Sequence, residues 1–157
     1  MTLSVPPGQL LTWTKLLTAL HGLTAIYRRG MLVKRVERCR GAATHALGLM
    51  GPTLRNLDFS HARERVMATP EEALLPLAEA LWSEALVAAF DLSKQLAFEP
   101  NDQRALAASD LYRDVRTALF CCLEDAESEV ILVAVTGSKD VDLDRRFIYY
   151  RERQVGA

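Results

Sequence analysis

Apolar residues recur at the helical period along most of this chain, with polar residues between them. After the breaker Pro6-Pro7-Gly8, a first apolar stripe predicts a helix that ends near Arg28. A second stripe begins beyond Gly30 at i, i+4, i+7 and i+11, which predicts a second amphipathic helix. The two stripes are Leu10, Trp13, Leu17 and Leu20, then Leu32, Val36, Cys39 and Ala43.

Glycine and proline at Gly48, Gly51 and Pro52 interrupt this pattern, so we expect a turn there. The clearest helix start is Thr69-Pro70-Glu71-Glu72, which predicts a capping box with Thr69 at the N-cap and Glu72 at N3. A long seam follows, bent at Pro76, and another helix begins after Pro100. Their stripes are Leu74, Ala78, Leu81, Ala85, Ala88, Leu92 and Leu96, then Leu111, Val115, Ala118 and Cys122.

The last thirty residues have a different pattern. Residues 130–135 (VILVAV) form a continuous apolar run, residues 136–144 are rich in turn formers, and residues 145–150 (RRFIYY) are aromatic. This order predicts a C-terminal β-hairpin, with a helical continuation as the alternative.

Composition supports one globular domain over residues 1–157. The chain is 50% apolar and 25% charged, and it has no internal repeat or low-complexity linker. We therefore predict a mainly α fold, a bundle of four or five helices with the C-terminal hairpin. Trp13, Trp82 and Tyr112 fall on the apolar stripes and are expected in the core, whereas Tyr149 and Tyr150 are better candidates for stacking or an interface.

The net charge of −1 conceals two oppositely charged halves. Residues 1–70 contain 10 Lys and Arg against 3 Asp and Glu, a charge of +7. Residues 71–157 contain 9 against 17, a charge of −8. A basic half and an acidic half predict two kinds of contact, one with polyanions and one with proteins.

A basic face on the second helix is the leading candidate for nucleic-acid binding. On a helical wheel its cations lie away from the apolar stripe, and their arginine content suits bidentate phosphate contacts. The alternative is that this surface docks on the acidic half of the same chain or of a second copy. The candidate residues are Arg28, Arg29, Lys34, Arg35, Arg38, Arg40, Arg63 and Arg65.

Several site types lack their motifs. No phosphate-loop, HExxH or zinc-ligand spacing occurs, so we expect no cofactor and no metal. The odd cysteine count, Cys39, Cys121 and Cys122, and the absence of a signal peptide favour a reducing cytoplasm, with the cysteines as buried apolar side chains. Because Lys15 and His21 interrupt the apolar stretch from residue 9 to 27, we expect no membrane anchor.

Residues 42–57 are compatible with a helix-turn-helix. Apolar residues and the turn glycine Gly48 occupy suitable positions, and Arg55 and Asn56 could reach base edges. Two core helices joined by a glycine turn explain the same pattern.

The stretch TLRNLDFSHARERV, residues 53–66, carries one further pattern. Arg55-Asn56, four intervening residues and His61 resemble the R-x4-6-H signature of the HEPN superfamily, whose members are helical bundles and in many cases metal-independent RNases. The resemblance covers residues 50–86 and implies His61 as general acid or base, Arg55 as stabiliser of phosphorane charge, and Asn56 as orienting residue. Arg40 and His45 satisfy the same loose spacing, although Gly41 follows that arginine.

Two classes of function follow. The first is a non-catalytic helical subunit of a ribonucleoprotein, similar in size, helicity and basic face to the small subunits of CRISPR effector complexes, with RNA as partner and the acidic half contacting proteins or other copies. The second is a HEPN-like endoribonuclease or toxin, and a helix-turn-helix DNA-binding regulator is a third interpretation. Cleavage of RNA by the purified chain separates the first two.

Overall fold

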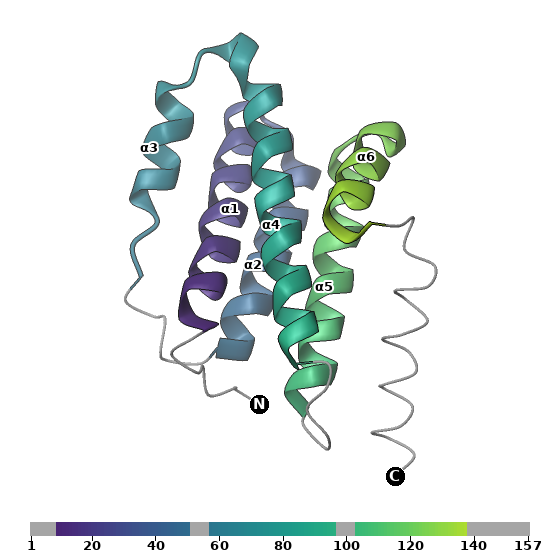
Figure 1. Cartoon of the computed structure of the whole chain (residues 1–157). Helices are drawn as coiled ribbons and strands as arrows, with labels where there is room; N and C mark the ends of the chain where they lie inside the picture. The colour runs from purple at the N-terminus through teal and green to yellow at the C-terminus, as the bar shows by residue number, and fades with distance from the viewer. Residues whose placement is uncertain (1–8, 51–56, 97–102, 138–157) are drawn as a thin grey trace.

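The computed structural model describes residues 9–50, 57–96 and 103–137, and within these ranges the chain is almost entirely helical. Successive helices run in alternating directions (Figure 1). In chain order the elements are α1 (Leu10–Arg29), α2 (Val33–Met50), α3 (Ser60–Ala68), the short 3₁₀ helix η3 (Glu71–Ala73), α4 (Leu74–Leu96), α5 (Gln103–Cys122) and α6 (Asp125–Thr136).

Four of these helices enclose the hydrophobic core. α1 packs against α2 and α4, and α5 packs against the same two helices, so the four form a closed ring. α3 lies against the outside of α1, and α6 lies against α4 and α5 (Figure 1). The expected core aromatics Trp13, Trp82 and Tyr112 are all buried, as are the predicted stripe residues Leu111, Val115, Ala118 and Cys122.

The contact between α1 and α4 combines a close approach with a buried hydrogen bond. A Cβ atom on Gly22 would lie 2.9 Å from the Leu81 Cδ1 atom, so the glycine lets the two helices come together. One turn further along, the Trp82 Nε1–H donates a hydrogen bond to the Tyr27 hydroxyl at 2.8 Å, and both side chains are buried. Burial is the main reason that the pKa of the Tyr27 phenol lies above its usual range.

The expected helical bundle is confirmed, but the described residues form six α-helices where four or five were predicted, and three local predictions are wrong. Residues 130–135 belong to α6 and are not a strand, and the second expected strand, residues 145–150, lies outside the described residues. No capping box forms at Thr69, because its hydroxyl donates to the Arg65 carbonyl at 2.7 Å and so belongs to the end of α3. The helix after it begins as expected, with Glu71 and Glu72 in its first turn.

Gly48 is helical and is not a turn residue. α2 continues through it to Met50, and open space surrounds the position where a Cβ atom would be. The helix-turn-helix interpretation needs a turn at Gly48, so residues 42–50 do not have that geometry.

Among the described residues, one segment, Glu71–Lys94, is long and apolar enough to cross a membrane by length and composition alone. Its inward stripe includes Ala78, Leu81, Ala85 and Leu92, which are buried against the bundle. The core helix of a soluble bundle has these properties, and the cytoplasmic location stays a prediction.

Candidate functional site

A groove with a volume of about 430 Å³ runs between α1, α2 and α3 and the segment that leads into α3. Arg28 comes from α1, Arg40 from α2 and Arg63 from α3, and all three side chains are exposed. Thus three guanidinium groups from three helices line the same hollow. The other lining residues are His21, Thr24, Ala25, Ala43, Thr44, Leu47, Leu57, Asp58 and Phe59.

An aromatic pair forms part of the groove wall. The His21 and Phe59 rings are stacked, with centroids 4.2 Å apart and planes 9° apart. Burial, aided by the nearby Arg63 charge, lowers the pKa of His21 below its usual value. The buried Nε2 atom of His21 has no hydrogen-bond partner among the described residues. Burial thus disfavours the protonated form of His21, whose ring packs flat against Phe59.

Asp58 is the only carboxylate in the groove lining of the described residues, and its oxygens are already engaged. It accepts hydrogen bonds from the Ser60 backbone N–H at 2.9 Å and from the Ser60 hydroxyl at 3.0 Å. These two bonds lower the pKa of Asp58, and the nearby Arg63 charge acts in the same direction. Asp58 stays charged at the start of α3, but three guanidinium groups outnumber this one carboxylate, so the described groove lining keeps a net positive charge.

This arrangement suits the binding of phosphate-like anions. Guanidinium groups offer planar, bidentate donors, and their fixed charge does not depend on physiological pH. A second cavity of about 440 Å³, between α1 and α4, differs because Lys15 lies there with Glu84 and Asp91. Of these two cavities between described helices, the groove at α3 is the one that combines several cations with a single, engaged carboxylate.

The predicted nucleic-acid-binding cations do not all line the groove. Arg40 lines the groove, whereas Lys34, Arg35 and Arg38 lie outside it on α2. The Arg35 guanidinium lies over the Tyr27 ring, 5.8 Å from its centroid. Arg65 is exposed on α3, outside the groove lining.

Arg29 has a structural contact of its own. It donates to the carbonyl oxygens of Val66 at 2.9 Å and Thr69 at 2.6 Å, at the end of α3. A cation at a helix C-terminus satisfies carbonyls that lack helical partners. Arg29 therefore ties α3 to α1 and shapes the groove indirectly.

The predicted catalytic residues are not brought together by any described contact. Arg55 and Asn56 lie outside the described residues. His61 is described, and its side chain is 96% exposed, with Nδ1 3.5 Å from the Glu64 Oε2 atom. His61 is also absent from the groove lining.

Arg40 and His45, the second arginine-histidine pair, both lie on α2 but face in different directions. Arg40 lines the groove, whereas His45 Nδ1 lies 3.1 Å from the Asp114 Oδ2 atom on α5. Arg40 and His45 therefore face different neighbours. Within the described ranges, no group of three or more His, Cys, Asp or Glu side chains could hold a metal ion.

The cysteines differ in their surroundings more than expected. Cys39 and Cys122 are buried, as predicted, but Cys121 is exposed. Interaction with the Cys122 thiol on α5 raises the pKa of the Cys39 thiol on α2, and burial raises it further. The same interaction, with Arg35 and Arg38 nearby, lowers the pKa of Cys122 against the effect of its burial.

We expect only Cys121 to react quickly with iodoacetamide in the folded protein, because burial shields the other two thiols. Mass spectrometry of peptides after a short labelling pulse measures this directly. In urea, all three cysteines should be labelled. Rapid native labelling of Cys39 would contradict the buried contact between α2 and α5.

Sequence reasoning missed His21, Asp58 and Phe59 as parts of the groove. No motif marks them, and Arg28, Arg40 and Arg63 were grouped with the other cations. A helical wheel of α2 does contain one usable signal: Arg38 and Arg40 lie about 100° to either side of Cys39. Because Cys39 is buried, the two arginines must occupy opposite flanks of the helix.

Comparison with protein-family models, with curated proteins and with solved structures finds no match for this chain. The resemblance to the HEPN superfamily therefore still depends on the residues that suggested it.

Proposed function

We propose that this chain binds nucleic acid, with RNA as the expected form, as a non-catalytic accessory subunit of a ribonucleoprotein in the cytoplasm. One observation carries the proposal: Arg28, Arg40 and Arg63 converge from three helices on one groove. Several guanidinium groups at one hollow are suited to successive phosphates of a strand. The compact helical shape and the separate acidic half fit a subunit that contacts RNA on one side and proteins on another.

The accessory role is preferred to an enzyme because no accessible, unengaged general base lies in the described lining of the groove. The Nε2 atom of His21 is buried, and Asp58 accepts hydrogen bonds from Ser60. No contact of a described residue favours the HEPN-like RNase, since its Arg55 and Asn56 lie outside the described residues and His61 contacts Glu64.

Two arginines on α3 provide a matched test of the groove. Arg63 lines it and Arg65 does not, yet both are exposed on the same helix. We expect Arg63→Glu to weaken binding of a labelled single-stranded RNA by about tenfold, since it removes a charge-assisted contact and adds repulsion. Arg65→Glu makes the same change in net charge and should weaken binding by about twofold through long-range attraction only.

Fluorescence anisotropy measures both affinities, and the same oligonucleotide as DNA and as a duplex identifies the preferred form. Equal losses for the two variants, or no binding by the wild type, would contradict the groove as the site. The wild type should leave the RNA intact on prolonged incubation, and His61→Ala should bind as the wild type does. Cleavage that disappears in His61→Ala would establish the RNase instead.

A further inference from the structure

The turn between α1 and α2 forms an exposed apolar tip, Met31-Leu32-Val33. Met31 is 84% exposed, Leu32 41% and Val33 65%. Met31 has a left-handed φ of 59°, and its N–H bonds the Arg28 carbonyl while the Leu32 N–H bonds the Tyr27 carbonyl. Glycine usually occupies this position in such a helix end. A large apolar residue thus projects into solvent at a position where its backbone is strained.

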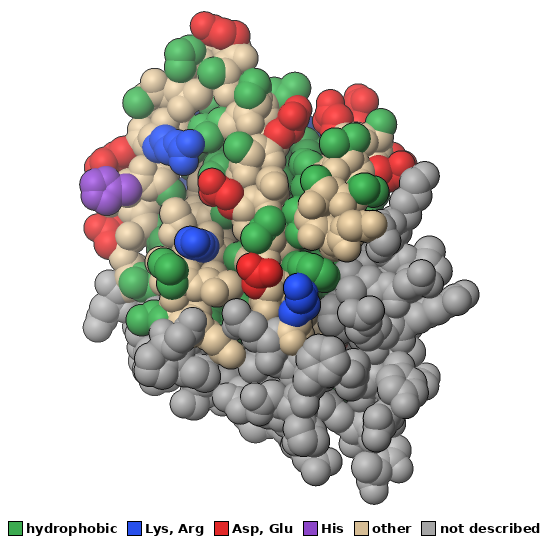
Figure 2. All heavy atoms as spheres, viewed as in Figure 1, with side chains coloured by type: hydrophobic (Ala, Val, Ile, Leu, Met, Phe, Trp, Pro, Cys, Tyr) green, Lys and Arg blue, Asp and Glu red, His purple; other side chains and the backbone are tan. Residues whose placement is uncertain are grey.

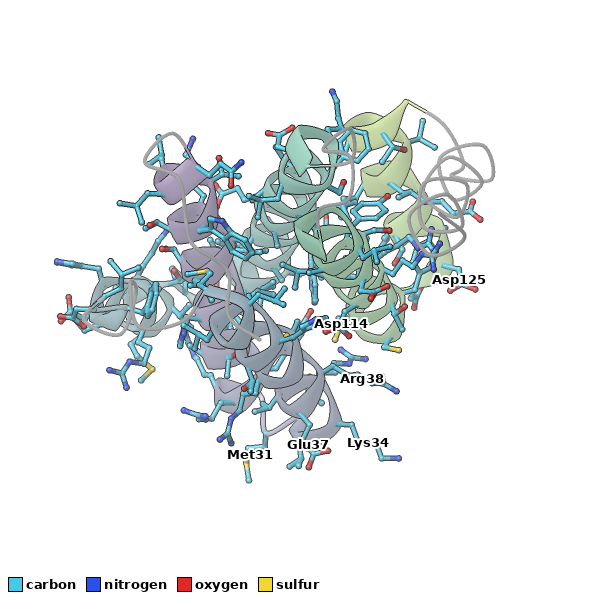
Figure 3. The ribbon with its side chains drawn as sticks, turned by 90° about the horizontal axis from the view of Figure 1, so that it is seen from below. Met31, Lys34, Glu37, Arg38, Asp114 and Asp125 are labelled. Carbon is cyan, nitrogen blue, oxygen red and sulfur yellow. The ribbon has the colours of Figure 1, made fainter. Side chains whose placement is uncertain are left out.

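Basic residues flank the tip on both sides. Arg28 and Arg29 precede it, and Lys34 and Arg35 follow it, with Arg38 one turn later. Arg29 donates hydrogen bonds to the end of α3, and Arg35 lies over the Tyr27 ring. Lys34 and Arg38, in contrast, form no ion pair within the described part of the chain. Figure 3 shows both projecting from the side of α2 that faces α5, with Met31 at the end of the helix. Glu37 is the one acidic residue of α2 and leaves this flank basic.

A second exposed apolar surface lies on α6, and the charged residues beside it are acidic. Val130 is 70% exposed and Val133 40%, and Ala126 and Ala134 are exposed at helical spacing beside them. Asp125 and Glu129 are exposed on the same helix and form no ion pair among the described residues. Figure 2 shows acidic and hydrophobic side chains side by side in the region of α6.

We propose that the tip of one copy of this chain docks on the α6 surface of a second copy. Both surfaces have an apolar centre and charged edges, and the two edges have opposite charge. Their association therefore buries apolar area. It also pairs Lys34 and Arg38 of one copy with Asp125 and Glu129 of the other. Contact between two tips would instead place Lys34 and Arg38 of one copy against the same two cations of the other. This inference does not depend on the nucleic-acid proposal, because Lys34, Arg38 and α6 all lie outside the groove.

The contact can be reciprocal. In Figure 3, Lys34 and Arg38 project from α2 toward the side of the view on which Asp125 of α6 lies. A two-fold arrangement then lets each tip meet the α6 surface of the other copy, and the expected product is a dimer.

A charge exchange tests the contact. Lys34→Glu/Arg38→Glu makes both sides of the proposed charge pairs acidic, and Asp125→Lys/Glu129→Lys makes both sides of these pairs basic. Each variant alone should be monomeric by light scattering coupled to size exclusion. An equimolar mixture should recover the dimer, because every tip then meets an α6 surface of opposite charge. A mixture that stays monomeric while the wild type is dimeric would overturn the proposal.

Met31→Gly separates association from folding. Glycine relieves the left-handed strain and removes the exposed side chain, so this variant should have a higher melting temperature than the wild type and a dimer at least about fivefold weaker. A destabilised surface variant could lose association through unfolding, but a stabilised one cannot. An unchanged dimer in Met31→Gly would exclude the tip from the interface.

Nuclease-treated protein and Arg63→Glu are the controls for bridging by nucleic acid. Both should dimerise as the wild type does, even where RNA binding is lost, so failure of one proposal does not imply failure of the other. A wild-type monomer at high concentration would overturn the self-association. Flotation of that monomer with vesicles containing anionic lipid, lost in Met31→Gly, would identify a membrane as the occupant of the tip instead.

Discussion

Replacing Trp82 by alanine should lower the free energy of unfolding by about 3–5 kcal/mol. Trp82 is fully buried on α4, inside the ring of four helices. Its removal exposes a cavity in the core and leaves the Tyr27 hydroxyl without its hydrogen-bond donor. Urea unfolding followed by circular dichroism should show the loss, with a decrease of roughly 6–20 °C in the melting temperature.

Two further substitutions accompany this test. One measures the contribution of the hydrogen bond, and the other is a control at an exposed position. Tyr27→Phe keeps the ring but leaves the buried Trp82 N–H unsatisfied, so it should cost about 1–3 kcal/mol. Val87→Ala, on α4 like Trp82, removes an exposed side chain and should change the free energy of unfolding by less than about 0.5 kcal/mol. If Trp82→Ala and Val87→Ala had equal effects, Trp82 would not be a core residue.

Neutralising the groove should have the largest effect on binding. The triple variant Arg28→Gln/Arg40→Gln/Arg63→Gln removes all three guanidinium groups that line it. At low salt we expect single-stranded RNA affinity to fall by about 10²-fold to 10³-fold, since each guanidinium–phosphate contact contributes on the order of tenfold. The slope of log affinity against log salt should become shallower by about 2, or about 0.7 for each lost contact.

A second triple variant controls for net charge. Lys15→Gln/Arg65→Gln/Lys94→Gln removes the same number of charges outside the groove lining. It should retain most of the affinity and most of the salt dependence. The groove arginines are exposed, and Arg29, which holds α3, is unchanged, so both variants should unfold close to the wild type. Equal loss of affinity in both would mean that binding follows overall charge.

The sequence alone determined the helices and most of the core. Their apolar stripes are long and regular, and the side chains predicted to face inward on α4 and α5, such as Leu81, Leu92, Leu111 and Val115, are buried. Periodicity succeeds here because each stripe must be covered by a neighbouring helix, whichever helix that is. The same reasoning placed Trp13, Trp82 and Tyr112 correctly.

Short apolar runs were less informative about secondary structure, as the wrongly predicted strand at residues 130–135 shows. A run of six apolar residues at 130–135 fits a strand or a helix equally well by its spacing. In the structure Asp125 and Glu127 lie in the first turn of α6, where negative charge is favourable, and Gly137 ends the helix with a left-handed φ of 80°. Only Leu132 of that run is buried, while Val130 and Val133 remain exposed, so packing on one side sufficed to hold it as a helix.

The candidate sites depended on tertiary structure. The sequence showed that the first half of the chain is basic, but it could not show that Arg40 faces the groove with Arg28 and Arg63, while Arg38 on the same helix faces away from it. That separation arises because α2 is buried along Cys39 and Ala46, which leaves two exposed flanks with different neighbours. The contact of Cys39 with Cys122 and of His45 with Asp114 has the same origin. Periodicity specifies which side of a helix is inside, because that is a local property of the sequence. Which residues meet across the bundle depends on how the helices are ordered around the core, and that order was decided only when all of them packed together.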